Sequence, residues 1–211
     1  MNLTDLRDMV RRDLRDTIPA NYRWPDDTLD RHLRRAVAEY SSAASRQMKA
    51  ILVSTFGSMD LDISTLTDRT SVMAVEYPID LKPRKFRPFT VWADRLTLEN
   101  CAPPDGGDIA VYYGMLHTLD TAGTTLPSQH FDLIATGAGA YAAIEWAAYA
   151  VNRINSGSNA ASDYFRWGKE RMGIFRDELR RLTRKSSFRT GKFFRPVETH
   201  TCNADTDFFS E

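Results

Sequence analysis

The stretch that decides the fold is Tyr22-Arg23-Trp24-Pro25-Asp26-Asp27, a short hinge between two amphipathic segments. Pro25 disfavours a helical conformation at Trp24 and suits a turn or a first helical turn. We expect the Trp24 indole to be buried and Asp26 or Asp27 to cap the helix that follows. The adjacent acids also fit a paired carboxylate for acid–base chemistry or a divalent ion, but capping is the favoured interpretation.

Helical periodicity flanks the hinge on both sides. Apolar residues of segment 4–16 fall on one stripe opposite Arg and Asp, which predicts an amphipathic helix with Thr4 as its cap. A second helix is expected from about Asp27 to Ser45, with Leu29, Leu33 and related positions on its apolar face. Residues 1–48 are therefore predicted to form an N-terminal helical pair.

The period changes from helical to alternating beyond residue 48, which predicts a β-rich module at residues 49–126. Its β-prone runs are residues 51–56, 72–79, 89–98 and 109–116. Asp105-Gly106 predicts a tight hairpin with positive φ between two of these strands. The module is thus expected to be an insertion between helices.

Residues 127–185 return to the helical period and complete the predicted helical body. Ser128 is the expected cap of a helix ending near Asn155, and a last helix is expected from about Ala161 to Arg184. Small residues recur every four positions on the first of these helices, where another helix can approach closely. These packing residues are Ala135, Gly139, Ala143 and Ala147.

Several other patterns in the sequence have a structural interpretation. Segment 137–142 matches the GxGxxA form of a dinucleotide-binding turn, but it lies within a helical period without a βαβ unit, so close packing is favoured. Segment 131–151 approaches the length of a membrane span, yet its Ala and Gly content and its two carboxylates favour a buried helix. Glu145 must find a partner or solvent; an arginine of the same or a neighbouring subunit and exposure at the helix edge both remain open.

Composition gives no indication of catalysis. The 211 residues carry 28 basic and 28 acidic side chains, so no whole-molecule field favours nucleic acid. The four histidines are dispersed, only two cysteines occur without a CxxC motif, and no GxSxG elbow is present. We expect no catalytic, cofactor-binding or metal-binding residues, and a reducing cytoplasm is the default compartment.

Residues 186–211 lack a periodic core face. Along this segment the basic residues come first and the acidic residues follow. Segment 180–195 carries seven cations and no acid, which fits a solvated helix end, contact with DNA phosphates, or an arm that docks on a partner protein. Five phenylalanines in a segment that cannot fold alone favour the docking arm. Its predicted contact residues are Phe188, Arg189, Lys192, Phe193, Phe194, Arg195, Phe208 and Phe209.

The order of these features resembles the head-to-tail adaptor, or connector, proteins of tailed bacteriophages. Besides the hinge, the resemblance rests on Ala36-Val37-Ala38-Glu39-Tyr40-Ser41, on a strand at 109–113 before His117-Thr118-Leu119, and on Thr125-Leu126-Pro127. It covers roughly residues 3–185. It implies an α+β, mainly α fold: a four-helix adaptor body, a β-rich insertion between helices 2 and 3, and an extended C-terminal arm.

The resemblance also implies a function without chemistry. Such a subunit forms a homo-oligomeric ring, in many phages of 12 copies, below the portal protein; the ring contacts tail or neck proteins and passes genomic DNA without sequence specificity. The expected location is the virion neck, after assembly in the host cytoplasm, with no membrane. The size of the β insertion departs from the smallest all-helical adaptors. The alternative function is a nucleic-acid-binding packaging or regulatory module that uses segment 180–195.

Overall fold

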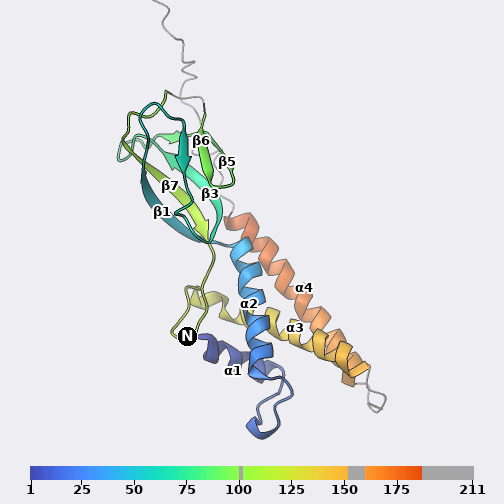
Figure 1. Cartoon of the computed structure of the whole chain (residues 1–211). Coiled ribbons are helices and arrows are strands. Elements are labelled where there is room, and N and C mark those ends of the chain that lie inside the picture. The colour runs from blue at the N-terminus through green and yellow to red at the C-terminus, as the bar shows by residue number, and fades with distance from the viewer. Residues whose placement is uncertain (100–101, 152–159, 187–211) are drawn as a thin grey trace, which may run out of the picture. The chain divides into compact units, whose positions relative to one another are not determined.

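A computed structural model of the chain describes residues 1–99, 102–151 and 160–186 (Figure 1). Within these ranges four α-helices and two small antiparallel sheets form an α+β fold, and every strand lies between the second and third helices. The chain divides into two compact units. The helical unit comprises Met1–Arg46 and Leu116–Ser187, and the β unit comprises Gln47–Met115.

Helix α1 (Leu3–Asp13) buries its apolar stripe, including Leu6 and Val10, in the core of the helical unit. Its cap is Asn2 and not Thr4, so the prediction of Thr4 was wrong. The side chain of Asn2 accepts the Asp5 N–H at 3.1 Å, and the Asp5 carboxylate accepts the Asn2 N–H at 2.9 Å. This reciprocal pair is a capping box that begins the helix two residues earlier.

Helix α2 (Asp26–Ala43) begins within the hinge stretch, directly after Pro25 and one residue before the predicted start. Pro25 occupies the N-cap position, and no side chain caps the helix. The prediction that Asp26 or Asp27 caps the helix was therefore wrong, because both residues already lie in its first turn. Negative charge in this turn still complements the positive end of the helix dipole.

Helices α3 (Phe131–Val151) and α4 (Ala160–Ser186) complete the helical unit. A single 3₁₀ turn at Ser128–His130 precedes α3, and Ser128 makes no capping hydrogen bond, so its predicted role was wrong. In the described part of the chain, no helix combines the length and apolar character needed to span a bilayer. The GxGxxA match lies wholly inside α3, where its glycines form helix and not a turn.

The predicted packing residues Ala135, Gly139, Ala143 and Ala147 are all buried. Tight contacts between α3 and α4 also occur at two glycines outside this set. A Cβ atom at Gly168 would lie 2.8 Å from Ile144 Cγ1 and 3.1 Å from the Ala140 carbonyl oxygen, and one at Gly137 would lie 2.8 Å from the Phe175 ring. The two helices therefore pack at a separation that only glycine permits at these points.

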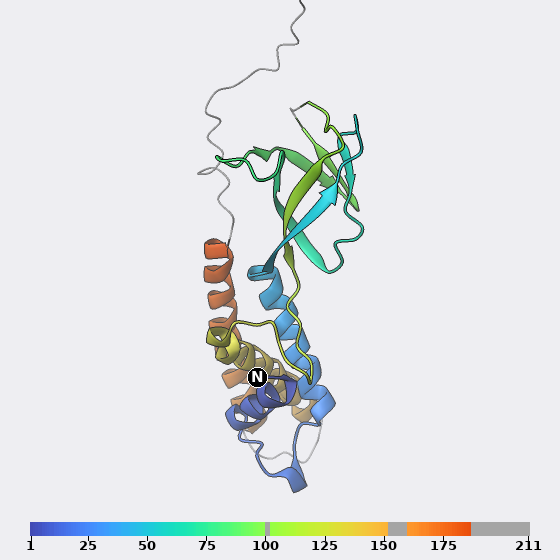
Figure 2. The same ribbon diagram turned by 90° about the vertical axis from the view of Figure 1, so that its left-hand side faces the viewer.

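Residues 116–126 belong to the helical unit, although the sequence placed them in the β module. Figure 2 shows this return segment running alongside α2. The Oγ of Ser41 accepts the His117 N–H at 3.0 Å. The His117 ring lies between two carbonyls: Nε2 is 3.1 Å from the Ala44 carbonyl oxygen, and Nδ1 is 3.0 Å from the Thr125 carbonyl oxygen and 3.2 Å from its hydroxyl. This His117 clasp fixes the return segment to the end of α2.

Seven short strands form the β unit. One sheet has the order β1-β7-β3-β4 and the other has the order β2-β6-β5. The strands are β1 (Arg46–Val53), β2 (Asp60–Asp62), β3 (Arg69–Glu76), β4 (Phe86–Arg87), β5 (Phe89–Trp92), β6 (Arg95–Leu98) and β7 (Asp108–Met115). Inward-facing apolar side chains such as Ile63, Val75 and Leu96 give this unit its own core.

Two turns of the β unit differ from expectation. The single run predicted at 89–98 is a hairpin in which Trp92 pairs with Arg95, because Ala93 adopts a φ of 51° without a glycine to signal the turn. Gly106 has the expected positive φ of 89°, but it lies between β6 and β7, which belong to different sheets. The predicted Asp105-Gly106 hairpin was therefore wrong, although the turn exists.

The α3–α4 contact gives the first testable prediction. Gly168→Ala should lower the free energy of unfolding by about 1–3 kcal/mol, because overpacking against Ile144 outweighs the gain in helix propensity. Gly173→Ala is the matched control on the same helix: nothing lies within 4 Å of its Cβ position, so it should gain up to about 1 kcal/mol. Urea denaturation followed by circular dichroism distinguishes the two. Equal stabilisation by both changes would contradict the close contact.

Candidate functional site

The most elaborate polar cluster in the helical unit surrounds Arg11, a residue of α1 that is only 3% exposed. Its guanidinium donates to Asp16 at 2.7 Å, to Asp26 at 2.5 Å and to the Trp24 carbonyl at 3.0 Å. The same group lies 3.5 Å from the centroid of the Tyr22 ring. Arg11 thus contacts three of the six residues of the hinge stretch, and we call this set with Asp16 the hinge network.

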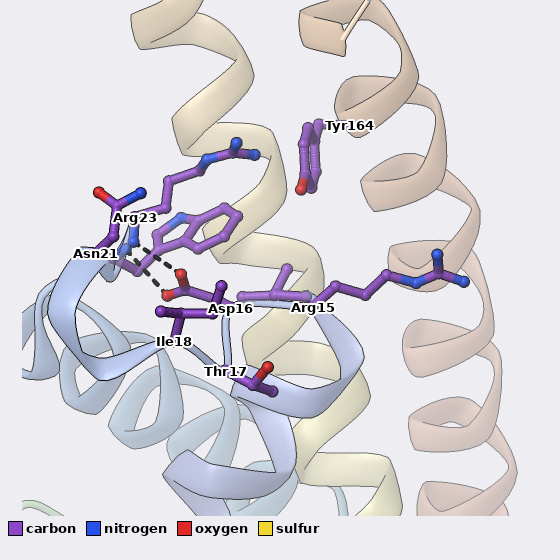
Figure 3. Close-up of a pocket in the computed structure, with 9 residues that line it drawn as sticks. Arg15, Asp16, Thr17, Ile18, Asn21, Arg23 and Tyr164 are labelled. Carbon is purple, nitrogen blue, oxygen red and sulfur yellow. Dashed lines mark hydrogen bonds between the residues drawn. The ribbon is translucent and has the colours of Figure 1, made fainter.

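Asp16 organises the backbone of the loop that leads into the hinge. Its carboxylate accepts the N–H groups of Arg23 at 2.8 Å and Trp24 at 3.3 Å, shown as dashed lines in Figure 3. The preceding residue, Arg15, adopts a φ of 54°, which turns the chain sharply after α1. The loop therefore folds around Asp16, while Arg11 neutralises its charge.

The prediction that Trp24 is buried is confirmed, since its side chain is 3% exposed. Its indole N–H donates to the Ala142 carbonyl of α3 at 3.2 Å. The ring also meets Tyr164 of α4 edge-on, with centroids 5.7 Å apart, and Trp146 at 6.3 Å. Arg23 covers this aromatic group, 4.6 Å above the Trp146 ring. One hinge residue therefore contacts both C-terminal helices.

A second arginine joins α1 to α2 beside the hinge network. Arg7 binds Asp30 through two parallel hydrogen bonds of 2.7 and 2.9 Å. It also donates to Asp26 at 2.6 Å, so Asp26 bridges Arg7 and Arg11. Asp27 instead accepts the Thr28 N–H at 2.8 Å in the first turn of α2. The adjacent acids therefore have separate structural partners, and they do not form a paired acid–base site.

A cavity of about 460 Å³ opens beside the hinge network (Figure 3). Asp16 is the carboxylate that lines it, and its oxygens are already bonded to Arg11 and to two backbone N–H groups. Both oxygens of this carboxylate are therefore engaged by groups of the protein itself. Among residues 1–99, 102–151 and 160–186, no group of three His, Cys, Asp or Glu side chains could hold a metal ion.

Glu145 has its partners within the same chain. Its carboxylate accepts from Arg31 of α2 at 2.6 Å and lies 3.0 Å from Nε2 of His32. His32 is 4% exposed and stacks on Tyr141. Burial lowers the pKa of His32 below its usual value, while the charge of Glu145 opposes this shift in part. Glu145 of α3 is thus paired with α2.

Two cations in the described part of the basic segment are paired with acids of their own helix. Arg180 contacts Asp177 at 2.9 Å and Arg181 contacts Glu178 at 2.6 Å, both with exposed side chains. These pairs match the interpretation of a solvated helix end for this part. The predicted arm residues lie outside the described residues: Phe188, Arg189, Lys192, Phe193, Phe194, Arg195, Phe208 and Phe209.

Sequence reasoning missed Arg11, although it found the hinge that Arg11 holds. Arg11 lies eight residues after Leu3, on the apolar stripe where an aliphatic residue is expected. A cation in that position, followed by acids at Asp16 and Asp26, was the available signal for a buried ion pair. The helical pattern instead assigns the positive charge of Arg11 to the solvated face.

Comparison with known proteins assigns no family. No protein-family model matches the chain, and no curated protein sequence matches it significantly. The functional inference therefore rests on the order of elements in the sequence and on the contacts described above.

The second prediction concerns the hinge network. Arg11→Met should cost about 3–5 kcal/mol of unfolding free energy, because it leaves the buried Asp16 carboxylate without its cation. Arg12→Met is the matched control; Arg12 is the exposed neighbour on the same helix, and the change should stay within about 0.5 kcal/mol. Chemical denaturation of both variants gives the comparison. Similar small losses in the two would show that the network is not a structural centre.

The third prediction follows from the lowered pKa of His32. Because the folded state binds its proton less readily than the unfolded state, stability is full above about pH 6.5 and falls as the pH drops below it. His32→Gln should therefore reduce the loss of stability between about pH 7.5 and 5. Part of the loss should persist, since burial also lowers the pKa of His130. Urea titrations across this range measure both slopes, and an unchanged slope would rule out His32 as the cause.

Proposed function

We propose that the chain is a non-enzymatic structural subunit, a head-to-tail adaptor that forms a ring below the portal in the neck of a tailed bacteriophage. The observation that carries the proposal is the order of elements: helix, Trp-Pro hinge, helix, β insertion, small-residue helix and a last helix leading into an aromatic arm. Twelve copies are proposed for the ring, with assembly in the host cytoplasm.

The contacts of the helical unit support a scaffold role. The charged groups at the hinge and on α3 are engaged with one another: Asp16 with Arg11, Asp30 with Arg7, and Glu145 with Arg31. Such charge-assisted pairs help to fix the geometry of the helices. A ring subunit needs this kind of rigid body, because each copy must present the same two surfaces to its neighbours.

The β unit supports a role as a platform for other proteins. Several of its large apolar side chains are exposed: Ile51 at 55%, Val53 at 72%, Phe56 at 80% and Trp92 at 86%. Exposed aromatic and aliphatic residues are enriched at protein interfaces. We propose that this unit contacts tail or neck proteins, while residues 186–211 form the arm that docks on the portal.

Nucleic-acid binding is the competing proposal, with segment 180–195 as the phosphate-contacting surface. The pairing of Arg180 and Arg181 with acids of their own helix makes this segment a weaker ligand for phosphates. The equal numbers of basic and acidic residues also disfavour a tight grip on DNA. A weak, sequence-independent contact suits a conduit through which genomic DNA slides.

The fourth prediction tests the arm. Removing residues 186–211 should weaken binding to the portal protein of the same phage by at least about tenfold, a loss of about 1.4 kcal/mol, because the arm supplies the docking contacts. A chain with the same 26 residues in scrambled order is the control for composition and charge. Helical content should be unchanged in both. Binding is measured by surface plasmon resonance, and rings are imaged by electron microscopy.

Two results would count against the adaptor proposal. One is full-length protein that stays monomeric with the portal present and is absent from purified virions. The other is binding to duplex DNA whose affinity falls steeply with salt concentration, since that slope reports several phosphate contacts and favours the competing function. Undiminished portal binding after the deletion would refute the docking arm alone.

A further inference from the structure

A basic groove lies on the surface where α2, α3 and α4 meet within the helical unit. Its volume is about 590 Å³. The side chains that define it combine cations with aromatic rings: Arg35, Tyr141, Phe165, Lys169, Arg176 and Arg180. None of these residues contributes to the hinge network.

Charge in the basic groove is only partly neutralised. Arg35 contacts Glu39 at 3.4 Å and Arg180 contacts Asp177 at 2.9 Å, both as exposed pairs of modest strength. Within the described residues, Lys169 and Arg176 make no ion pair with a carboxylate. The groove therefore has spare capacity for two or more anionic groups.

The groove also offers apolar surface beside its cations. Phe165 is 46% exposed, and Lys169 lies 5.4 Å from its ring centroid. The Tyr141 ring also lines the groove, with the Arg35 guanidinium 3.9 Å from its centroid. A ligand that suits this surface carries carboxylates next to aromatic rings. Phosphate alone would use the cations but leave the rings in water.

The chain itself contains a segment of that composition. Residues 198–211 hold four acids and neither lysine nor arginine, and Asp205-Thr206-Asp207-Phe208-Phe209 places two acids directly before two phenylalanines. We propose that this acidic segment occupies the basic groove of its own chain in the free subunit. The inference concerns the unassembled protein and does not depend on the adaptor function.

The tether is long enough for this docking. Eighteen residues, 187–204, separate the end of α4 from Asp205, and they can span up to about 60 Å. Arg180 lies only about 9 Å along the helix from Ser186, since each helical residue rises about 1.5 Å. Covalent attachment holds the segment at a high effective concentration near the groove, so even weak ion pairs keep it bound. Occupation covers Phe208 and Phe209, which are costly to leave in water.

Carbodiimide cross-linking of the full-length protein tests the proposal. The reagent joins an amine to a carboxylate only when they are in contact, and mass spectrometry then identifies the linked residues. We expect Lys169 to be linked to Asp205, Asp207 or Glu211. Raising the salt to about 0.5 M should suppress the linkage, because it screens exposed ion pairs.

Two double variants each remove two positive charges, one variant inside the groove and the other outside it. Arg176→Gln with Arg180→Gln removes two cations of the groove, and Arg12→Gln with Arg166→Gln removes two exposed cations elsewhere. In each pair one arginine of α4 contacts an aspartate three residues earlier: Arg180 with Asp177 and Arg166 with Asp163. The groove variant should lower the yield of the Lys169 linkage about fivefold to tenfold, the effect of losing two exposed ion pairs. The control variant should keep the wild-type yield.

Mixing isotopically heavy and light protein identifies the occupant. Linkages confined to chains of one mass support the proposal, whereas linkages that join heavy to light chains would assign the groove to a second copy and overturn it. Absence of any Lys169 linkage, or equal yields in the two variants, would also overturn it. If Lys169 stays unlinked and the groove variant selectively loses affinity for short duplex DNA, the groove is a phosphate site instead.

Discussion

The helical unit depends on one buried guanidinium. Arg11 neutralises Asp16, binds Asp26 at the start of α2 and holds the carbonyl of Trp24, so a single side chain joins α1, the loop after it and α2. Trp24 then extends this link to α3 through its indole N–H. Charge burial is costly unless every donor and acceptor is matched, and here the matching partners come from three separate segments. The network therefore specifies the arrangement of the helices as well as stabilising it.

Much of the fold could be predicted from periodicity. All four helices, the burial of Trp24 and the small-residue packing of α3 follow from spacings that the sequence shows directly. The misses have a common physical cause, because each depends on a local or tertiary contact that residue type does not reveal. Asn2 caps α1 through Asp5, Ala93 turns the β5–β6 hairpin without glycine, and Arg11 is buried because acids distant in sequence surround it. For the candidate site, the hinge could be located but its central cation could not.

The helical unit and the β unit differ in which side chains they expose and which they pair. In the helical unit, the charged groups around the hinge pair with one another. Asp16, the carboxylate that lines the adjacent cavity, is bound to Arg11. The β unit has a core of its own and exposes Phe56 and Trp92 almost fully. These exposed apolar side chains are available to contact a partner protein. In the free subunit, the proposed docking of the acidic segment would cover the basic groove in the helical unit.

The His117 clasp has a mechanical consequence. The chain leaves the helical unit after α2 and re-enters it at Leu116, so any pull on the β unit reaches the helices through these two crossings. His117 and Ser41 bind the two crossings together, within one residue of re-entry and close to the end of α2. Because these hydrogen bonds join the two crossings, a pull on the β unit is shared between them. Neither α2 nor the return segment is then separated from the other alone. Under a pull on the β unit, these hydrogen bonds must break before the return segment can separate from the end of α2.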